Sequence, residues 1–84
     1  MVDELKTRME KYLQKAKPLF DALETAQPTE VDLPHAAKEF HEMASAYYSD
    51  ALHFYKDGDY AKALAALEYA EGWMDAGKRL GILR

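Results

Sequence analysis

The chain contains no cysteine, which excludes disulfides and thiolate-ligated metals as sources of stability. It also has no apolar run near the roughly 20 residues that a membrane-spanning helix requires. The early charges Asp3, Glu4 and Lys6 interrupt any hydrophobic stretch of the kind found in a signal peptide. We therefore expect a cytoplasmic protein without a membrane partner, whose aliphatic and aromatic residues supply the stability.

Basic residues are scarce: the formal net charge is −4 over 84 residues. Nucleic-acid binding through phosphate neutralisation usually requires a basic domain, so we expect no nucleic-acid partner. The charge is unevenly placed, because residues 1–17 hold five bases against three acids and residues 18–77 hold three bases against twelve acids. The first helix is thus the basic element of an acidic protein.

The residues of common catalytic sites are also rare. Ser45 and Ser49 are the only serines, and no glycine-rich phosphate loop precedes a helix. No nucleophile has a base at a suitable spacing. We expect neither enzymatic activity nor a cofactor.

Small residues, in contrast, recur every seven positions in two segments. They are Ala37, Ala44 and Ala51 in the first segment, and Ala63, Ala70 and Gly77 in the second. An antiparallel pairing across a turn at Gly58 and Asp59 gives the larger residues the same register: Phe40 with Met74, Tyr47 with Leu67, and Phe54 with Tyr60. Such a seam predicts a close-packed helical hairpin.

Apolar spacing predicts three helices, over about residues 3–25, 33–57 and 59–80, in one domain spanning residues 1–84. The apolar face of the first helix comprises Leu5, Met9, Tyr12, Ala16, Leu19 and Leu23. Pro18 projects from the polar side, so it predicts a bend and not a break. The expected architecture is all-α, an up-down-up antiparallel three-helix bundle.

Turn-forming residues mark both connections. Residues 25–34 contain Pro28, Thr29 and Asp32, which predict a long connection with a helix cap. Gly58 suits the left-handed position after the second helix, and Asp59 suits the cap of the third. Gly81 predicts the end of the third helix.

The hairpin has two aromatic flanks, and the first helix can cover only one of them. We expect it to cover the side of Met43, Tyr69 and Trp73. The opposite flank would then stay partly exposed as an interaction surface, formed by Tyr48, Leu52, Tyr55 and Leu64. The leading functional hypothesis is a non-enzymatic interaction or self-assembly module that binds a protein partner or a second copy as a homodimer.

Two polar clusters give alternatives. Glu68, Glu71, Gly72 and Asp75 form an acidic stripe, either a docking site for a cationic partner or a solvated face with a tolerated glycine. Asp50, His53 and Asp57 share a helix face, which resembles half of a metal-binding motif. The inward-pointing acids of the full motif are missing, so we expect a solvated face and no metal. A small-ligand or divalent-metal-binding regulator is the second functional hypothesis.

Two stretches resemble known families. Residues 55–64 resemble the turn of a tetratricopeptide repeat, but the pattern occurs once and such solenoids need about three copies. Residues 70–77 read Ala-Glu-Gly-Trp-Met-Asp-Ala-Gly, and with the Tyr-Tyr and Gly-Asp-Tyr elements before them they resemble the archaeal domain-of-unknown-function family 357. That resemblance covers essentially the whole chain. It implies a three-helix bundle in an archaeal cytoplasm and supplies no catalytic residue.

Overall fold

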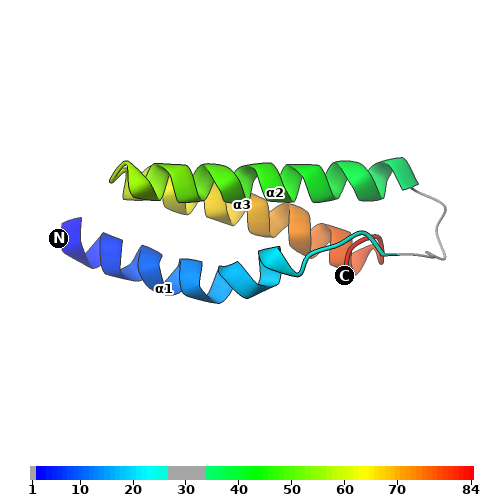
Figure 1. Ribbon diagram of the computed structural model, residues 1–84, viewed down its shortest axis with the longest axis horizontal. Coiled ribbons are helices and arrows are strands. Elements are labelled where there is room, and N and C mark those ends of the chain that lie inside the picture. The colour runs from blue at the N-terminus through cyan, green and yellow to red at the C-terminus, as the bar shows by residue number, and fades with distance from the viewer. Residues whose placement is uncertain (1, 27–33) are drawn as a thin grey trace.

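Three α-helices make up the computed structural model, which describes residues 2–26 and 34–84. They are α1 (Val2–Asp21), α2 (Pro34–Lys56) and α3 (Tyr60–Arg79). The helices lie side by side with alternating directions, in a rod of 47 × 17 × 16 Å (Figure 1). This arrangement confirms the predicted all-α bundle. Pro28, Thr29 and Asp32, the predicted turn and cap residues, lie outside the described residues.

Small side chains form the seam between α2 and α3. Ala44, Ala51, Ala63 and Ala70 are fully buried. Rings meet beside this seam, and each ring pair lies within two residues of the predicted register: Phe40 with Trp73, Tyr47 with Tyr69, and Tyr55 with Tyr60. Because the seam side chains are small, α2 and α3 pack closely along their length.

The turn between α2 and α3 has the predicted chemistry. Gly58 has a φ of 80°, the left-handed conformation that glycine adopts without steric cost. The Asp59 carboxylate accepts a hydrogen bond of 3.1 Å from the Lys62 amide and caps α3. The hairpin is therefore specified locally as well as by its seam.

Helix α1 continues through Pro18, as predicted, and its ribbon is bowed (Figure 1). Its predicted end near residue 25 is wrong, because the helix stops at Asp21. Beyond it, the Glu24 amide and carbonyl are both hydrogen-bonded to the backbone of Arg84, at 2.9 Å each. A residue whose backbone groups are bonded elsewhere cannot extend a helix.

The last residues of the chain form a pairing that the sequence analysis did not predict. Gly81 ends α3 with a φ of 76°, and the chain then turns back so that residues 82–84 run antiparallel to residues 24–26. Ile82 is fully buried and Leu83 nearly so. We refer to this arrangement as the tail pairing; it joins the end of α3 to the end of α1.

The tail pairing gives Gly77 a further role beside its predicted place in the seam. A Cβ at this position would lie 2.6 Å from Leu83 Cγ. The absence of a side chain at Gly77 therefore makes room for the returning tail.

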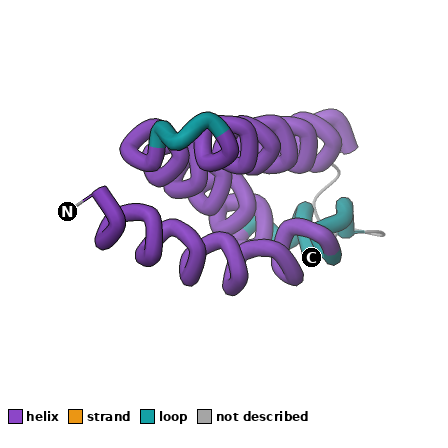
Figure 2. The backbone as a smooth tube through the Cα atoms, turned by 60° about the vertical axis from the view of Figure 1, so that its left-hand side comes forward, coloured by secondary structure: helices purple, strands orange, loops and turns teal. Residues whose placement is uncertain are grey.

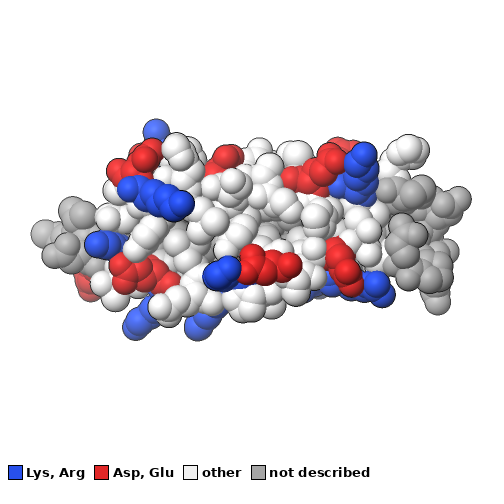
Figure 3. Space-filling view, viewed as in Figure 1, with Lys and Arg blue, Asp and Glu red and all other residues white. Residues whose placement is uncertain are grey.

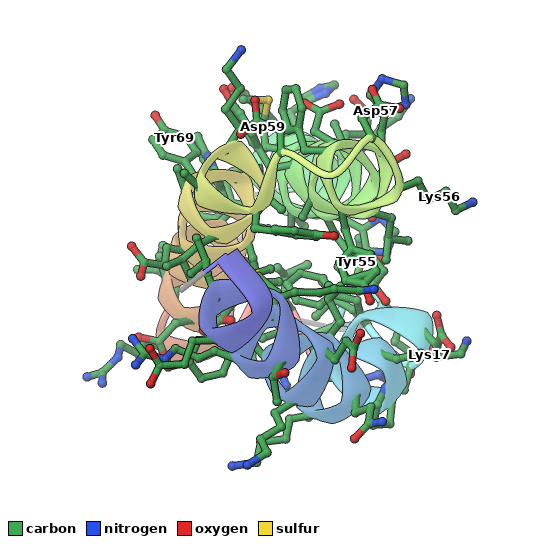
Figure 4. All side chains as sticks on the ribbon, turned by 90° about the vertical axis from the view of Figure 1, so that its left-hand side faces the viewer. Lys17, Tyr55, Lys56, Asp57, Asp59 and Tyr69 are labelled. Carbon is green, nitrogen blue, oxygen red and sulfur yellow. The ribbon has the colours of Figure 1, made fainter. Side chains whose placement is uncertain are left out.

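The prediction of which flank α1 covers is wrong. The Phe20 ring stacks on Tyr48 with centroids 4.4 Å apart, and the Tyr55 hydroxyl donates a 2.8 Å hydrogen bond to Glu10. That hydrogen bond raises the pKa of the Tyr55 hydroxyl. Tyr55 lies between α2 and α1, whereas Tyr69 points away from α1 (Figure 4). Helix α1 thus covers the flank that we expected to stay open.

The reason is the rotation of α1 about its own axis. Its buried face contains Met9, Ala16 and Phe20, whereas Tyr12 and Leu19 of the predicted face are exposed. This rotation directs the Phe20 ring onto Tyr48, on the flank that also carries Tyr55. The backbone of α1 also stays farther from the hairpin than α2 and α3 are from each other (Figure 2). The stacked rings of Phe20 and Tyr48 lie between α1 and α2.

Candidate interaction surface

The predicted interaction surface is not an open face. Its four residues, Tyr48, Leu52, Tyr55 and Leu64, are all half-buried. Tyr48 and Tyr55 contact α1, and Leu64 lines a groove between α1 and α3. Tyr48, Tyr55 and Leu64 therefore face α1.

The other flank carries a shallow apolar pocket of about 340 Å³. Its lining consists of Phe40, Glu68, Tyr69, Gly72, Trp73 and Ala76. Tyr69 is 56% exposed although its ring also contacts Tyr47, and the Trp73 ring packs edge-on against Phe40 with centroids 4.9 Å apart. The rings are thus held by the hairpin while part of their surface faces solvent.

Gly72 makes the pocket deeper. Tyr69, Gly72, Trp73 and Ala76 are spaced i, i+3, i+4 and i+7, which places them on one face of α3. A Cβ built at Gly72 would meet no atom within 4 Å, so the space above this backbone is empty. We call the surface formed by Phe40, Tyr69, Gly72, Trp73 and Ala76 the open flank.

The predicted acidic stripe meets the open flank at Glu68 and Gly72, whereas its Glu71 lines the groove between α1 and α3. Glu68, Glu71, Gly72 and Asp75 are all exposed on α3, and Glu68 and Gly72 line the pocket itself. Asp75 pairs with Arg79 at 3.0 Å. Partial burial of the carboxyl, together with the nearby charge of Glu68, raises the pKa of Glu71. The edge of the open flank thus carries negative charge next to apolar surface.

The predicted metal candidate is a pair and not a cluster. His53 Nε2 lies 3.2 Å from an Asp57 carboxylate oxygen, and both side chains are well exposed. Within residues 2–26 and 34–84, no three histidine, cysteine or acidic residues are placed to hold one ion. Asp50 is exposed on the same helix. The arrangement is that of a solvated surface pair.

A comparison with known protein families bears on this chain. The sequence model of a family described as "Protein of unknown function (DUF357)" matches residues 11–83. The chain belongs to the DUF357 family. The match includes most of α1, the whole hairpin and Leu83 of the tail pairing, so the DUF357 region contains every element that shapes the open flank. The chain matches no curated protein and no solved structure.

Other surfaces of this DUF357 protein are less distinctive. On the face where α1 and α2 meet, basic and acidic side chains lie next to one another (Figure 3). A second groove of about 320 Å³ between α1 and α3 contains both Arg8 and Glu71, so its charge is also mixed. Among the described helices, none is long and apolar enough to cross a membrane.

Sequence reasoning found only part of the site in this DUF357 protein. It identified the acidic stripe and noted both flanks of the hairpin, but it chose the wrong flank as the open one. Phe40 was predicted to lie in the seam opposite Met74, and the structure places it in the lining of the pocket. The contact that distinguishes the flanks is the stacking of the Phe20 ring of α1 on Tyr48.

Replacing Glu71 by glutamine is expected to stabilise the fold slightly at neutral pH. Because the pKa of Glu71 is raised in the folded state, the folded chain holds this proton more tightly than the unfolded chain does. The carboxylate therefore weakens the fold above its raised pKa, and this effect disappears below the ordinary pKa of a glutamate. The gain should stay under about 1 kcal/mol because solvent reaches the side chain.

Thermal melts of both proteins at neutral and acidic pH measure this effect. Glu39→Gln, an exposed change on α2, is the matched control. A gain from Glu71→Gln that is equal at both pH values would contradict the expectation.

Proposed function

We propose that this protein is a non-enzymatic interaction module that binds another protein through the open flank. The observation that supports this proposal is the asymmetry of the hairpin. Both of its flanks carry aromatic side chains, and α1 covers only the flank of Tyr48 and Tyr55. The rings of Tyr69 and Trp73 have no such cover among the described residues.

Exposed aromatic surface of this kind is typical of protein interfaces. Tyrosine and tryptophan are enriched at binding hot spots because they combine large apolar area with a polar atom. The apolar line along α3 continues from Tyr69 through Trp73 and Ala76 to Leu80, which is 53% exposed. A continuous patch costs solubility unless a partner covers it, so its presence favours recognition.

The chemistry of the pocket also favours recognition over catalysis. Its lining is aromatic or aliphatic except for Gly72 and the single carboxylate of Glu68. Catalytic sites generally combine a nucleophile or base with a second oriented polar group. The lining offers a shaped apolar surface and one charge at its edge, a set suited to seating a side chain of a partner.

Site-specific photo-crosslinking in cells that produce the protein tests the proposal. A photoreactive amino acid at Ala76, on the open flank, is expected to yield a covalent adduct of defined mass. The same amino acid at Ser49, an exposed position on α2, should yield no adduct. Adding Tyr69→Asp should abolish the Ala76 adduct without lowering the melting temperature much, since that ring is mostly exposed.

Two results would refute the proposal. One is the absence of any adduct from Ala76. The other is the same set of adducts from Ala76 and Ser49, which would indicate collisions without a defined surface.

A further inference from the structure

The open flank combines an apolar pocket with one acid at its edge, Glu68. Six acids of the described residues form ion pairs: Asp21 with Lys17, Glu24 with Arg84, Glu42 with Lys38, Asp57 with His53, Asp59 with Lys62 and Asp75 with Arg79. Within the described part of the chain Glu68 forms no ion pair, and its charge contributes to the raised pKa of Glu71. Glu68 lines the pocket of the open flank, whereas Glu71 lines the groove between α1 and α3.

We infer that the partner segment is a basic amphipathic helix lying along α3, with an apolar side chain in the pocket above Gly72 and a lysine or arginine near Glu68. This inference rests on the proposed function and specifies the chemistry of the partner. A groove between two rings, with bare backbone at its base, accepts a side chain from an adjacent helix. The unpaired Glu68 carboxylate at its edge favours a partner of positive charge.

The position of Gly72 supports this orientation. Glycine inside a helix costs about 0.8–1 kcal/mol relative to alanine. In the fold itself nothing requires glycine here, because an added Cβ would meet no atom within 4 Å. The missing side chain leaves room for an incoming group between Tyr69 and Trp73.

A second copy bound through the same flank fits less well. A symmetric dimer would place the Glu68 edge of one copy close to that of the other, in a protein that already has a net charge of −4. The basic outer side of α1 in another copy has a charge opposite to that of the Glu68 edge. A contact between these two different surfaces would join copies head to tail, and such an assembly need not close into a ring.

Trp73 reports occupancy of the pocket directly, because it is the only tryptophan and lines the pocket. The full chain is titrated with three tryptophan-free helical peptides: a leucine and lysine amphipathic helix, its counterpart with glutamate for lysine, and a scrambled basic peptide of the same composition. The basic amphipathic peptide should shift the Trp73 emission and bind at least about tenfold more tightly than the other two. Its affinity should fall as salt is raised.

Gly72→Ala separates binding from folding. The alanine should raise the melting temperature by up to about 4–8 °C, because it favours the helix. The substitution should also weaken the binding of the basic amphipathic peptide by about tenfold, because the methyl group of the alanine enters the pocket. A damaged fold cannot raise the melting temperature while it lowers the affinity for the peptide.

Glu68→Lys tests the charge at the edge of the pocket. This substitution should lower the affinity for the basic amphipathic peptide and raise the affinity for the acidic one. Glu42→Lys makes the same charge change on α2, where Glu42 pairs with Lys38 at the surface, and should leave both affinities unchanged.

The remaining outcomes refute the inference in distinguishable ways. Equal binding of the acidic or scrambled peptide, or no binding of any peptide, overturns the partner chemistry, while the Ala76 crosslink independently decides the proposed function. Concentration-dependent sedimentation of the protein alone, abolished by Gly72→Ala, would identify a second copy as the occupant and also overturn the inference.

Discussion

Replacing Ile82 by alanine is expected to lower the free energy of unfolding by about 2–5 kcal/mol. Ile82 is fully buried although it lies beyond the last helix. Its truncation removes buried methyl groups and leaves a cavity beneath the tail pairing, where the Ala26 amide donates a 2.9 Å hydrogen bond to the Ile82 carbonyl. Chemical denaturation followed by circular dichroism measures the loss.

Leu80→Ala is the matched control, two residues away. Leu80 is 53% exposed, so its truncation should change stability by less than about 0.5 kcal/mol. Equal effects of the two substitutions would mean that the tail does not pack as described.

Replacing Ala44 by leucine is expected to destabilise the protein by about 1–3 kcal/mol. Ala44 is fully buried in the seam between α2 and α3. Three additional carbons there must either push the helices apart or force neighbouring side chains out of their preferred rotamers. Denaturant titration gives the change in unfolding free energy.

Ala61→Leu provides the comparison for the seam. Ala61 is exposed on α3, and leucine is almost as good a helix former as alanine, so this change should be nearly silent. A similar cost for both substitutions would contradict the described seam.

The hairpin could be predicted from sequence because two independent signals agree on it. The seven-residue recurrence of alanine determines which sides of α2 and α3 face each other, and Gly58 with Asp59 determines where the chain reverses. A pattern with a regular period can be recognised in a single sequence, because several residues indicate the same helix face.

The tail pairing could not be predicted in this way. It comprises three residues on each side, too few for a period to appear. The burial of Leu83 depends on a glycine that had a sufficient explanation within the helical seam. The seven-residue recurrence accounted for Gly77 by itself, and only the structure shows that Leu83 also packs against this glycine.

The choice of flank failed for a different reason. Both flanks carry aromatic side chains, so hydrophobic area did not discriminate between them. The outcome depends on a modest rotation of α1, which buries Phe20 and exposes Leu19. Specific contacts determine such a rotation, here the ring stacking with Tyr48 and the hydrogen bond between Tyr55 and Glu10. The acidic stripe was found because its residues needed only to share a face of one helix.

The tail pairing also bears on the order in which the chain folds. Glu24 and Arg84 are 60 residues apart in sequence, yet their side chains meet at 2.8 Å and their backbones are hydrogen-bonded. Bringing together segments so far apart costs more loop-closure entropy than pairing α2 with α3, which are joined by a short turn. The topology therefore favours early formation of the hairpin, with closure between the two distant segments as a late step.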